Sequence, residues 1–145
     1  MTASGAWARR RARRAALQAV YQWQMTAADA YAVEQEFVES GALKKADEDF
    51  FRALLRGVMF SSGDLDQLLE PLLDRRVEEL DKVELALLRL GVYELRERPD
   101  VPFRVVIDEY VGLAKVFGAE DSFKYINGVL DRLAIQLRPL ERPSP

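Results

Sequence analysis

Five arginines stand within six positions near the start of the chain: Arg9, Arg10, Arg11, Arg13 and Arg14. No acidic residue precedes Asp29, whereas the whole chain carries a formal charge of −3. Without these five arginines the chain has 16 Lys and Arg against 24 Asp and Glu, so the rest of the chain carries a formal charge of −8. Arginine presents a planar fork of donors that matches phosphate oxygens, and it can lie flat on an exposed base. Local positive charge on an acidic chain predicts a polyanionic ligand, in particular a nucleic acid.

Two other interpretations of this segment do not involve nucleic acid. An Arg- and Ala-rich start without acids is also typical of a mitochondrial transit peptide, and it could form the solvated end of a helix. The residues that follow favour a folded helix. At 3.6 residues per turn an apolar arc is formed by Ala12, Ala16, Ala19, Val20 and Trp23, with Leu17 and Tyr21 at its borders. We expect the arginines to form an exposed, mobile basic arm on this helix, which becomes ordered on its ligand.

Length and composition predict one soluble domain. The expected boundaries are a flexible extension over residues 1–8, a domain over 9–137 and a disordered tail over 138–145. The chain has no Cys and no His, which excludes disulfides and thiolate ligands and leaves no basis for a zinc site. No apolar run approaches the roughly 18 residues that a membrane span needs. We expect a cytoplasmic protein without metal or cofactor.

The apolar residues repeat with a helical period along almost the whole chain, which predicts an all-α fold of about seven helices. The first predicted helix ends near Met25, and the second runs from Asp29 to Gly41. The third begins with an N-cap at Asp47 and ends at a break over Ser61 to Gly63, and the fourth covers 65–73 with an interruption at Pro71. The last three cover 80–95, about Val105 to Gly118, and 123–137. The segment 80–95 is apolar on many sides and therefore belongs at the centre. In the last helix Gly128 is expected to allow close helix packing.

A second candidate binding site lies where the last helix begins, in the segment 117–121. Unpaired N–H groups and the helix dipole can hold an anion there, and a base could stack on Tyr125 while Lys124 meets a phosphate. The alternative is that Glu120 and Asp121 cap the helix themselves and repel phosphate, which is the interpretation that this segment alone favours.

Catalytic residues are scarce in this sequence. It has no Gly-rich phosphate loop, no His that could act as a general base, and no pair of acids in an obviously buried setting. We therefore expect a binding protein and not an enzyme.

Several segments together resemble the NusB family of bacterial transcription antitermination factors. They are Arg9-Arg10-Arg11-Ala12-Arg13, Leu17-Gln18-Ala19-Val20-Tyr21-Gln22-Trp23-Gln24, Leu88-Arg89-Leu90, Asp100-Val101-Pro102, Phe117-Gly118-Ala119-Glu120-Asp121-Ser122 and Asn127-Gly128-Val129-Leu130-Asp131. The resemblance extends from Arg9 to about Leu133. It implies an all-helical fold of two small helical bundles without catalytic activity.

The resemblance also implies partners and site residues. Members of this family bind the boxA element of nascent ribosomal RNA as a single strand, together with the ribosomal protein NusE, and help RNA polymerase to read through terminators. The implied RNA-binding residues are Arg9, Arg10, Arg11, Arg13, Phe117, Asp121, Lys124 and Tyr125. The implied NusE-facing residues are Tyr21, Arg75, Glu78 and Glu84. With Tyr125 beside it, Asp121 would shape an RNA site while still serving the helix.

Two alternative functions remain at this point. Similar domains recognise RNA in RNA methyltransferases, but 145 residues leave no room for a cofactor-binding α/β domain. The other alternative is a helical homodimer that acts as a scaffold without nucleic acid.

Overall fold

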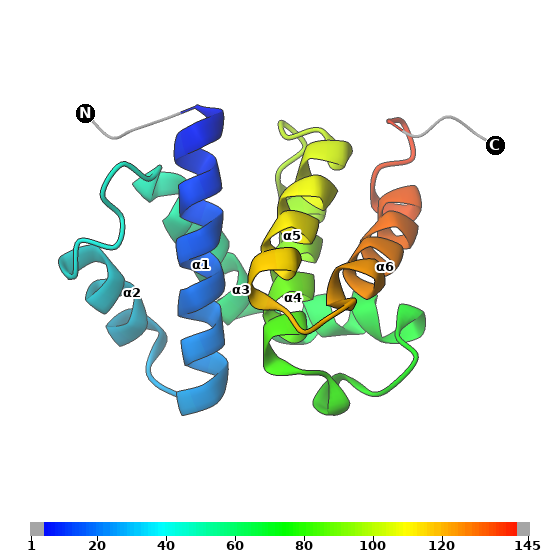
Figure 1. Cartoon of the computed structure of the whole chain (residues 1–145), viewed down its shortest axis with the longest axis horizontal. Helices are drawn as coiled ribbons and strands as arrows, with labels where there is room; N and C mark the ends of the chain where they lie inside the picture. The colour runs from blue at the N-terminus through cyan, green and yellow to red at the C-terminus, as the bar shows by residue number, and fades with distance from the viewer. Residues whose placement is uncertain (1–4, 142–145) are drawn as a thin grey trace. The chain divides into compact units, whose positions relative to one another are not determined.

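The computed structural model describes residues 5–141, which form six α-helices, two short 3₁₀ helices and no strand. The elements are α1 (Ala6–Thr26), α2 (Ala30–Glu39), α3 (Glu48–Leu69), η1 (Glu70–Leu72), η2 (Val77–Glu79), α4 (Lys82–Glu97), α5 (Phe103–Phe117) and α6 (Ser122–Leu137) (Figure 1). The all-α prediction is confirmed, and the expected number of about seven helices is close.

The break expected after Phe60 is a kink within α3. Ser61 has non-helical backbone angles, φ −127° and ψ 18°, but the helix continues to Leu69 and passes into η1, which contains Pro71. The chain divides at this kink into two compact units, the first ending at Phe60 and the second beginning at Ser61.

The first unit packs α1, α2 and the first part of α3 together. The apolar arc predicted for α1 is buried, since Ala12, Ala16, Ala19 and Val20 are all inaccessible to solvent. On α2 the ring of Phe37 stacks on Phe51 of α3, with 5.9 Å between the ring centroids. Small alanine side chains on α1 thus allow close packing, while aromatic rings fill the space between the other two helices.

Charged side chains tie α2 to α3 beside these rings. The guanidinium of Arg56 donates two hydrogen bonds to the Glu34 carboxylate, at 2.6 and 2.9 Å. The hydrogen bonds from Arg56 lower the pKa of Glu34, and this effect is larger than the opposite effect of burial. This carboxylate is buried and stays charged because of its arginine partner.

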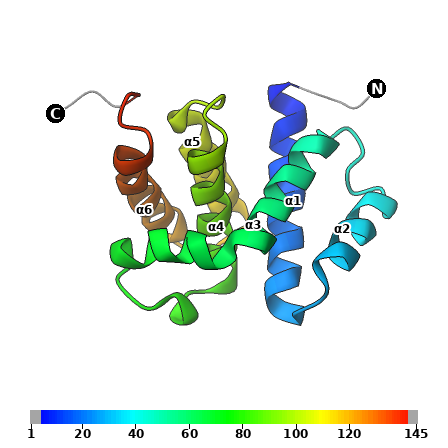
Figure 2. The ribbon, with the colours of Figure 1, turned by 180° about the vertical axis from the view of Figure 1, so that it is seen from behind.

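The second unit consists of the end of α3 and the helices α4, α5 and α6, of which the last three lie side by side (Figure 1). The expected central helix is α4, where Leu85, Leu87, Leu88 and Leu90 are buried. Figure 2 shows the part of α3 after Ser61 crossing the ends of α4 and α6. There Asp66 of α3 accepts two hydrogen bonds from Arg89 of α4, at 2.9 and 2.7 Å.

The close helix packing expected at Gly128 occurs at Gly91 of α4 instead. A Cβ at Gly91 would lie 2.7 Å from a methyl carbon of Leu130 on α6, whereas a Cβ at Gly128 would meet nothing within 4 Å. The prediction for Gly128 is therefore wrong. A helical period does not reveal which glycine faces the neighbouring helix.

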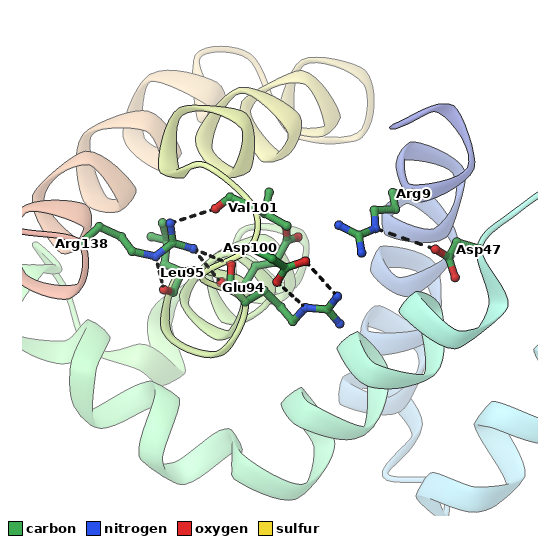
Figure 3. A network of polar contacts seen from close by, with 8 residues as sticks. Arg9, Asp47, Glu94, Leu95, Asp100, Val101 and Arg138 are labelled. Atoms are coloured by element: carbon green, nitrogen blue, oxygen red, sulfur yellow. Dashed lines mark hydrogen bonds and ion pairs between the residues drawn. The ribbon is translucent and has the colours of Figure 1, made fainter. Parts of the chain in front are cut away.

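A buried arginine ends the second unit (Figure 3). Arg138 donates hydrogen bonds to the carbonyl oxygens of Leu95 (2.7 Å), Val101 (2.9 Å) and Arg98 (2.8 Å), and it also pairs with Glu141. Carbonyls at the end of a helix lack intrahelical donors, and the guanidinium supplies them here. Arg138, expected in a tail over 138–145, is therefore part of the folded second unit, and residues 142–145 lie outside the described range.

The beginning of the chain also differs from the expected boundary. Ala6–Thr26 is helical, so α1 begins before Arg9, and Ala8 is already buried. The carbonyl oxygen of Ala8 accepts a hydrogen bond from the backbone N–H of Asp47, at 3.0 Å. Residues 6–8 of the extension predicted over 1–8 are thus helical, and residues 1–4 lie outside the described range.

Candidate nucleic-acid interface

The five arginines of α1 lie on two different sides of the helix. Arg10, Arg11 and Arg14 are exposed, at spacings of three and four residues that place them on one face. The first turn of α1 has no acidic residue, and Gly5 at the N-cap offers no side-chain acceptor. The helix dipole and three cationic side chains therefore act together at this end of the helix.

Arg13 and Arg9 point toward the start of α3. Arg13 is only 3% exposed, and its guanidinium lies 5.0 Å from the centroid of the Phe50 ring. Arg9 lies over the same ring at 4.6 Å, and its Nε is 3.8 Å from a carboxylate oxygen of Asp47 (Figure 3). The prediction that all these arginines are exposed and mobile is wrong at Arg13, because the first turn of α3 covers this side of α1.

Sequence reasoning missed Trp7, which stands one helical turn before Arg11. Its side chain is 65% exposed, and the Arg11 guanidinium lies 5.5 Å from the ring centroid. The spacing of four residues between an aromatic ring and an arginine on a helix was the available signal.

The site predicted in the second unit lies around the start of α6. α5 ends at the half-buried Phe117, and a Cβ at Gly118 would come 2.7 Å from the carbonyl oxygen of Ala114, so this turn requires glycine. Asp121 occupies the N-cap position in the left-handed conformation, with φ 67°. Its side chain makes no capping hydrogen bond and instead lies 3.3 Å from the Lys124 ammonium. Simple side-chain capping by Asp121 is therefore wrong.

Tyr125 lies one turn into α6, in contact with the segment between η1 and η2. The Arg75 guanidinium lies 5.0 Å from the Tyr125 ring centroid, and the backbone N–H of Asp74 donates to the tyrosine hydroxyl at 3.4 Å. Arg75 also donates to both carboxylate oxygens of Asp74, at 2.8 and 3.2 Å. These hydrogen bonds lower the pKa of Asp74, while burial raises the pKa of Tyr125. One residue implied for RNA and one implied for the partner thus touch directly.

The other residues implied for the partner surface are divided between the units. Glu84, in the first turn of α4, accepts a hydrogen bond from the hydroxyl of Ser122 at the start of α6. Glu78 is exposed in η2. Tyr21 belongs to the first unit, where it is 38% exposed on α1. Within the second unit, therefore, Arg75 and Glu84 both contact residues of α6.

The described part of the chain has neither a cluster of metal ligands nor a membrane-spanning helix. Among residues 5–141 no three acidic side chains come together as metal ligands. Within the same range no helix combines the length and apolar character that crossing a bilayer requires.

Comparison with known proteins gives the family. The model of the NusB family matches residues 10–135. The chain belongs to the NusB family. It is 58% identical over 134 residues to the transcription antitermination protein NusB of Alcanivorax borkumensis, an alignment that covers 92% of this chain and 89% of the relative. It is 50% identical over 132 residues to the protein of the same name from Edwardsiella ictaluri, covering 91% of this chain and 95% of the relative.

The fold is that of a solved NusB structure. The structure of T. maritima NusB matches with a TM-score of 0.79 and 34% identity, and the match covers 92% of each chain. The expectation of a NusB-like, all-helical fold is confirmed. This member of the NusB family is a transcription antitermination factor and not an enzyme.

Proposed function

We propose that the chain binds single-stranded boxA-type RNA of ribosomal RNA transcripts jointly with the ribosomal protein NusE, within the antitermination complex of RNA polymerase in the cytoplasm. The observation that carries the proposal is the cationic face of α1 on an acidic member of the NusB family. Its exposed arginines lie in a segment without acids, and the relatives at 58% and 50% identity are named transcription antitermination proteins. RNA phosphates are the polyanion that such a protein meets.

In the first unit Arg10 and Arg11 contact the RNA backbone, and Arg14 extends the same face. Arg9 exchanges its weak pairing with Asp47, at 3.8 Å, for a phosphate. Arg13 has a different role from the one the family resemblance implies. Because it is buried against Phe50, it positions the first turns of α1 and does not contact RNA.

In the second unit Lys124 contacts a phosphate, while Phe117 and Tyr125 offer rings to unpaired bases. The Lys124 side chain is 68% exposed, so its pairing with Asp121 costs little to exchange. Asp121 keeps the turn in the left-handed conformation that begins α6. This assignment gives Asp121 a positioning role beside the RNA.

NusE binds residues of both units: Tyr21 in the first, and Arg75, Glu78 and Glu84 in the second. Two of these residues also contact α6: Arg75 lies over the Tyr125 ring, and Glu84 accepts from Ser122. A partner that draws Arg75 away from the ring uncovers one face of it for a base. NusE and RNA then strengthen each other's binding, since coupling between two binding sites is reciprocal.

The RNA part of the proposal is tested by fluorescence anisotropy with a labelled boxA RNA and a scrambled RNA of equal length, at several salt concentrations. We expect tighter binding to boxA and affinity for both RNAs that falls as salt rises. Equal affinity for the two RNAs at every salt concentration would contradict boxA recognition.

The Tyr125→Ala and Tyr125→Phe variants in the same assay test the second unit. Tyr125→Phe should keep the ratio of boxA to scrambled binding, because the stacking ring remains, and Tyr125→Ala should lower it. An unchanged ratio in Tyr125→Ala would remove this residue from the site.

A further inference from the structure

We infer that Trp7 is a stacking platform for one unpaired base of a single-stranded nucleic acid, with Arg11 and Arg14 holding the phosphates beside that base. The inference rests on the proposed function and extends its site by one helical turn toward the N-terminus. It adds a residue outside the set that the family resemblance implies.

The first observation is the position of Trp7 on α1. Exposed residues follow one another at alternating spacings of four and three, from Trp7 through Arg11, Arg14 and Gln18 to Tyr21. Residues so spaced share one face of a helix. A ligand that meets the arginines on this face therefore also reaches the tryptophan ring.

The second observation is the geometry of the ring and its neighbour. The Trp7 side chain is 65% exposed, and the Arg11 guanidinium lies 5.5 Å from the ring centroid. This cation–π contact holds the ring beside the charge and restricts its orientation. A base stacked on the exposed part of the ring would have its phosphate within reach of the same guanidinium.

The charge around Trp7 selects the kind of ligand. The first turn of α1 contains no acid, and Gly5 has no side chain to cap it, so the helix dipole adds to the arginines and favours an anion. An acidic peptide would satisfy the charge but would make little use of the ring. Single-stranded nucleic acid satisfies both, because its bases are unstacked and each has a π-face, whereas bases in a duplex are not accessible in this way.

The test uses Trp7 as its own probe. The only other tryptophan is Trp23, so the Trp23→Phe variant leaves a single reporter on the proposed platform. This protein is titrated with oligouridylate and, in parallel, with polyglutamate as a polyanion without bases. We expect oligouridylate to quench the Trp7 emission and polyglutamate to leave it nearly unchanged.

Affinity for oligouridylate is then measured for Trp7→Ala, Trp7→Phe and Trp7→Leu at several salt concentrations. Loss of one stacked base should weaken binding by about 5- to 150-fold in Trp7→Ala, with most of the loss recovered by Phe but not by Leu. The dependence of affinity on salt should stay unchanged, since no charge is removed. Arg11→Ala should instead lower the slope of log K against log salt by about 0.7.

Met25→Ala is the matched control, because Met25 is 54% exposed near the other end of the same helix and should not affect binding. The inference is overturned if Trp7→Ala binds normally while Arg11→Ala is weakened, if Leu restores binding as well as Phe, or if polyglutamate quenches Trp7 equally. Each of these results leaves RNA binding by the arginines intact. Absence of binding by the parent protein would instead contradict the proposed function.

Discussion

The division of the arginines over two sides of α1 predicts two different phenotypes. Arg10, Arg11 and Arg14 are exposed, so replacing all three by Gln removes three surface charges but no buried side chain. Each phosphate contact on a single strand contributes about 0.7 to the slope of log affinity against log salt, so the triple variant should lose about 2.1. Between 50 and 200 mM salt, the parent should then weaken about 18-fold more than the variant. The melting temperature should change little, because contacts of exposed charged side chains contribute little to stability.

Arg13→Gln should give the opposite result. Its guanidinium is 3% exposed and 5.0 Å from the Phe50 ring centroid, so the substitution removes a desolvated cation–π contact worth about 2 kcal/mol. At about 2–4 °C per kcal/mol for a chain of this size, the melting temperature should fall by roughly 4–8 °C. The salt slope should not change.

The assays are anisotropy of a labelled single-stranded RNA at four salt concentrations and thermal unfolding followed by circular dichroism. The reasoning is refuted if Arg13→Gln lowers the salt slope as much as Arg11→Gln does while melting normally. That pair of results would mean that Arg13 reaches the phosphates. A triple variant with the slope of the parent would equally remove this face of α1 from the RNA site.

Three further predictions concern the stability of the fold. Arg138→Ala removes three hydrogen bonds of 2.7–2.9 Å from a buried guanidinium and should lower the free energy of unfolding in urea by about 3–5 kcal/mol; a loss below about 1 kcal/mol would mean that this arginine is not buried in solution. Gly91→Ala should cost about 1–3 kcal/mol, because its Cβ would lie 2.7 Å from a core leucine, whereas Gly128→Ala should be neutral or stabilising by up to about 1 kcal/mol; the reverse order would contradict the packing of α6 on α4. Glu34 has a lowered pKa in the folded protein, so the folded state binds fewer protons; the stabilisation is fully present above the unfolded pKa of about 4.3 and is lost as pH falls through the lower pKa of the folded state. Glu34→Gln should therefore lower the urea midpoint most at neutral pH, with an effect that shrinks as pH falls below about 4.3, and an effect that stays constant over this range would exclude the ion pair as its cause.

Features that depend on local periodicity could be predicted from the sequence. The alanines of α1 recur on one arc and are buried, and α4 is apolar on many sides and lies at the centre of the second unit. The predicted N-cap at Asp47 is confirmed, since its carboxylate accepts a hydrogen bond from the backbone N–H of Phe50 at the start of α3, at 3.0 Å. Each of these depends on residues within a few turns of one another.

Features that depend on distant partners could not be predicted. Arg138 is buried because it reaches carbonyls about 40 residues earlier, and Arg13 because the start of α3 lies over it. A charged residue at the end of a helix pattern is normally solvated, so the sequence carries no sign of either contact. The same holds for Gly91, whose neighbour Leu130 belongs to another helix.

The candidate site also combines features that local residues determine with features that distant residues determine. Arg10, Arg11 and Arg14 are exposed, as expected for the arginine segment, because no other described element of the first unit covers this side of α1. The contact of Arg75 with Tyr125 joins residues 50 positions apart, and the left-handed conformation of Asp121 follows from the turn between α5 and α6. Neither has a local signature in the residue types.

The affinity for boxA RNA, measured with and without saturating NusE at one salt concentration, tests joint binding most directly. The proposed function predicts that NusE raises the affinity for boxA RNA more than the affinity for scrambled RNA. It also predicts that Arg75→Ala reduces this increase but does not lower the affinity for boxA RNA in the absence of NusE. Joint recognition of the RNA would be contradicted if NusE left the affinity for boxA unchanged, or if it raised the affinity for both RNAs equally.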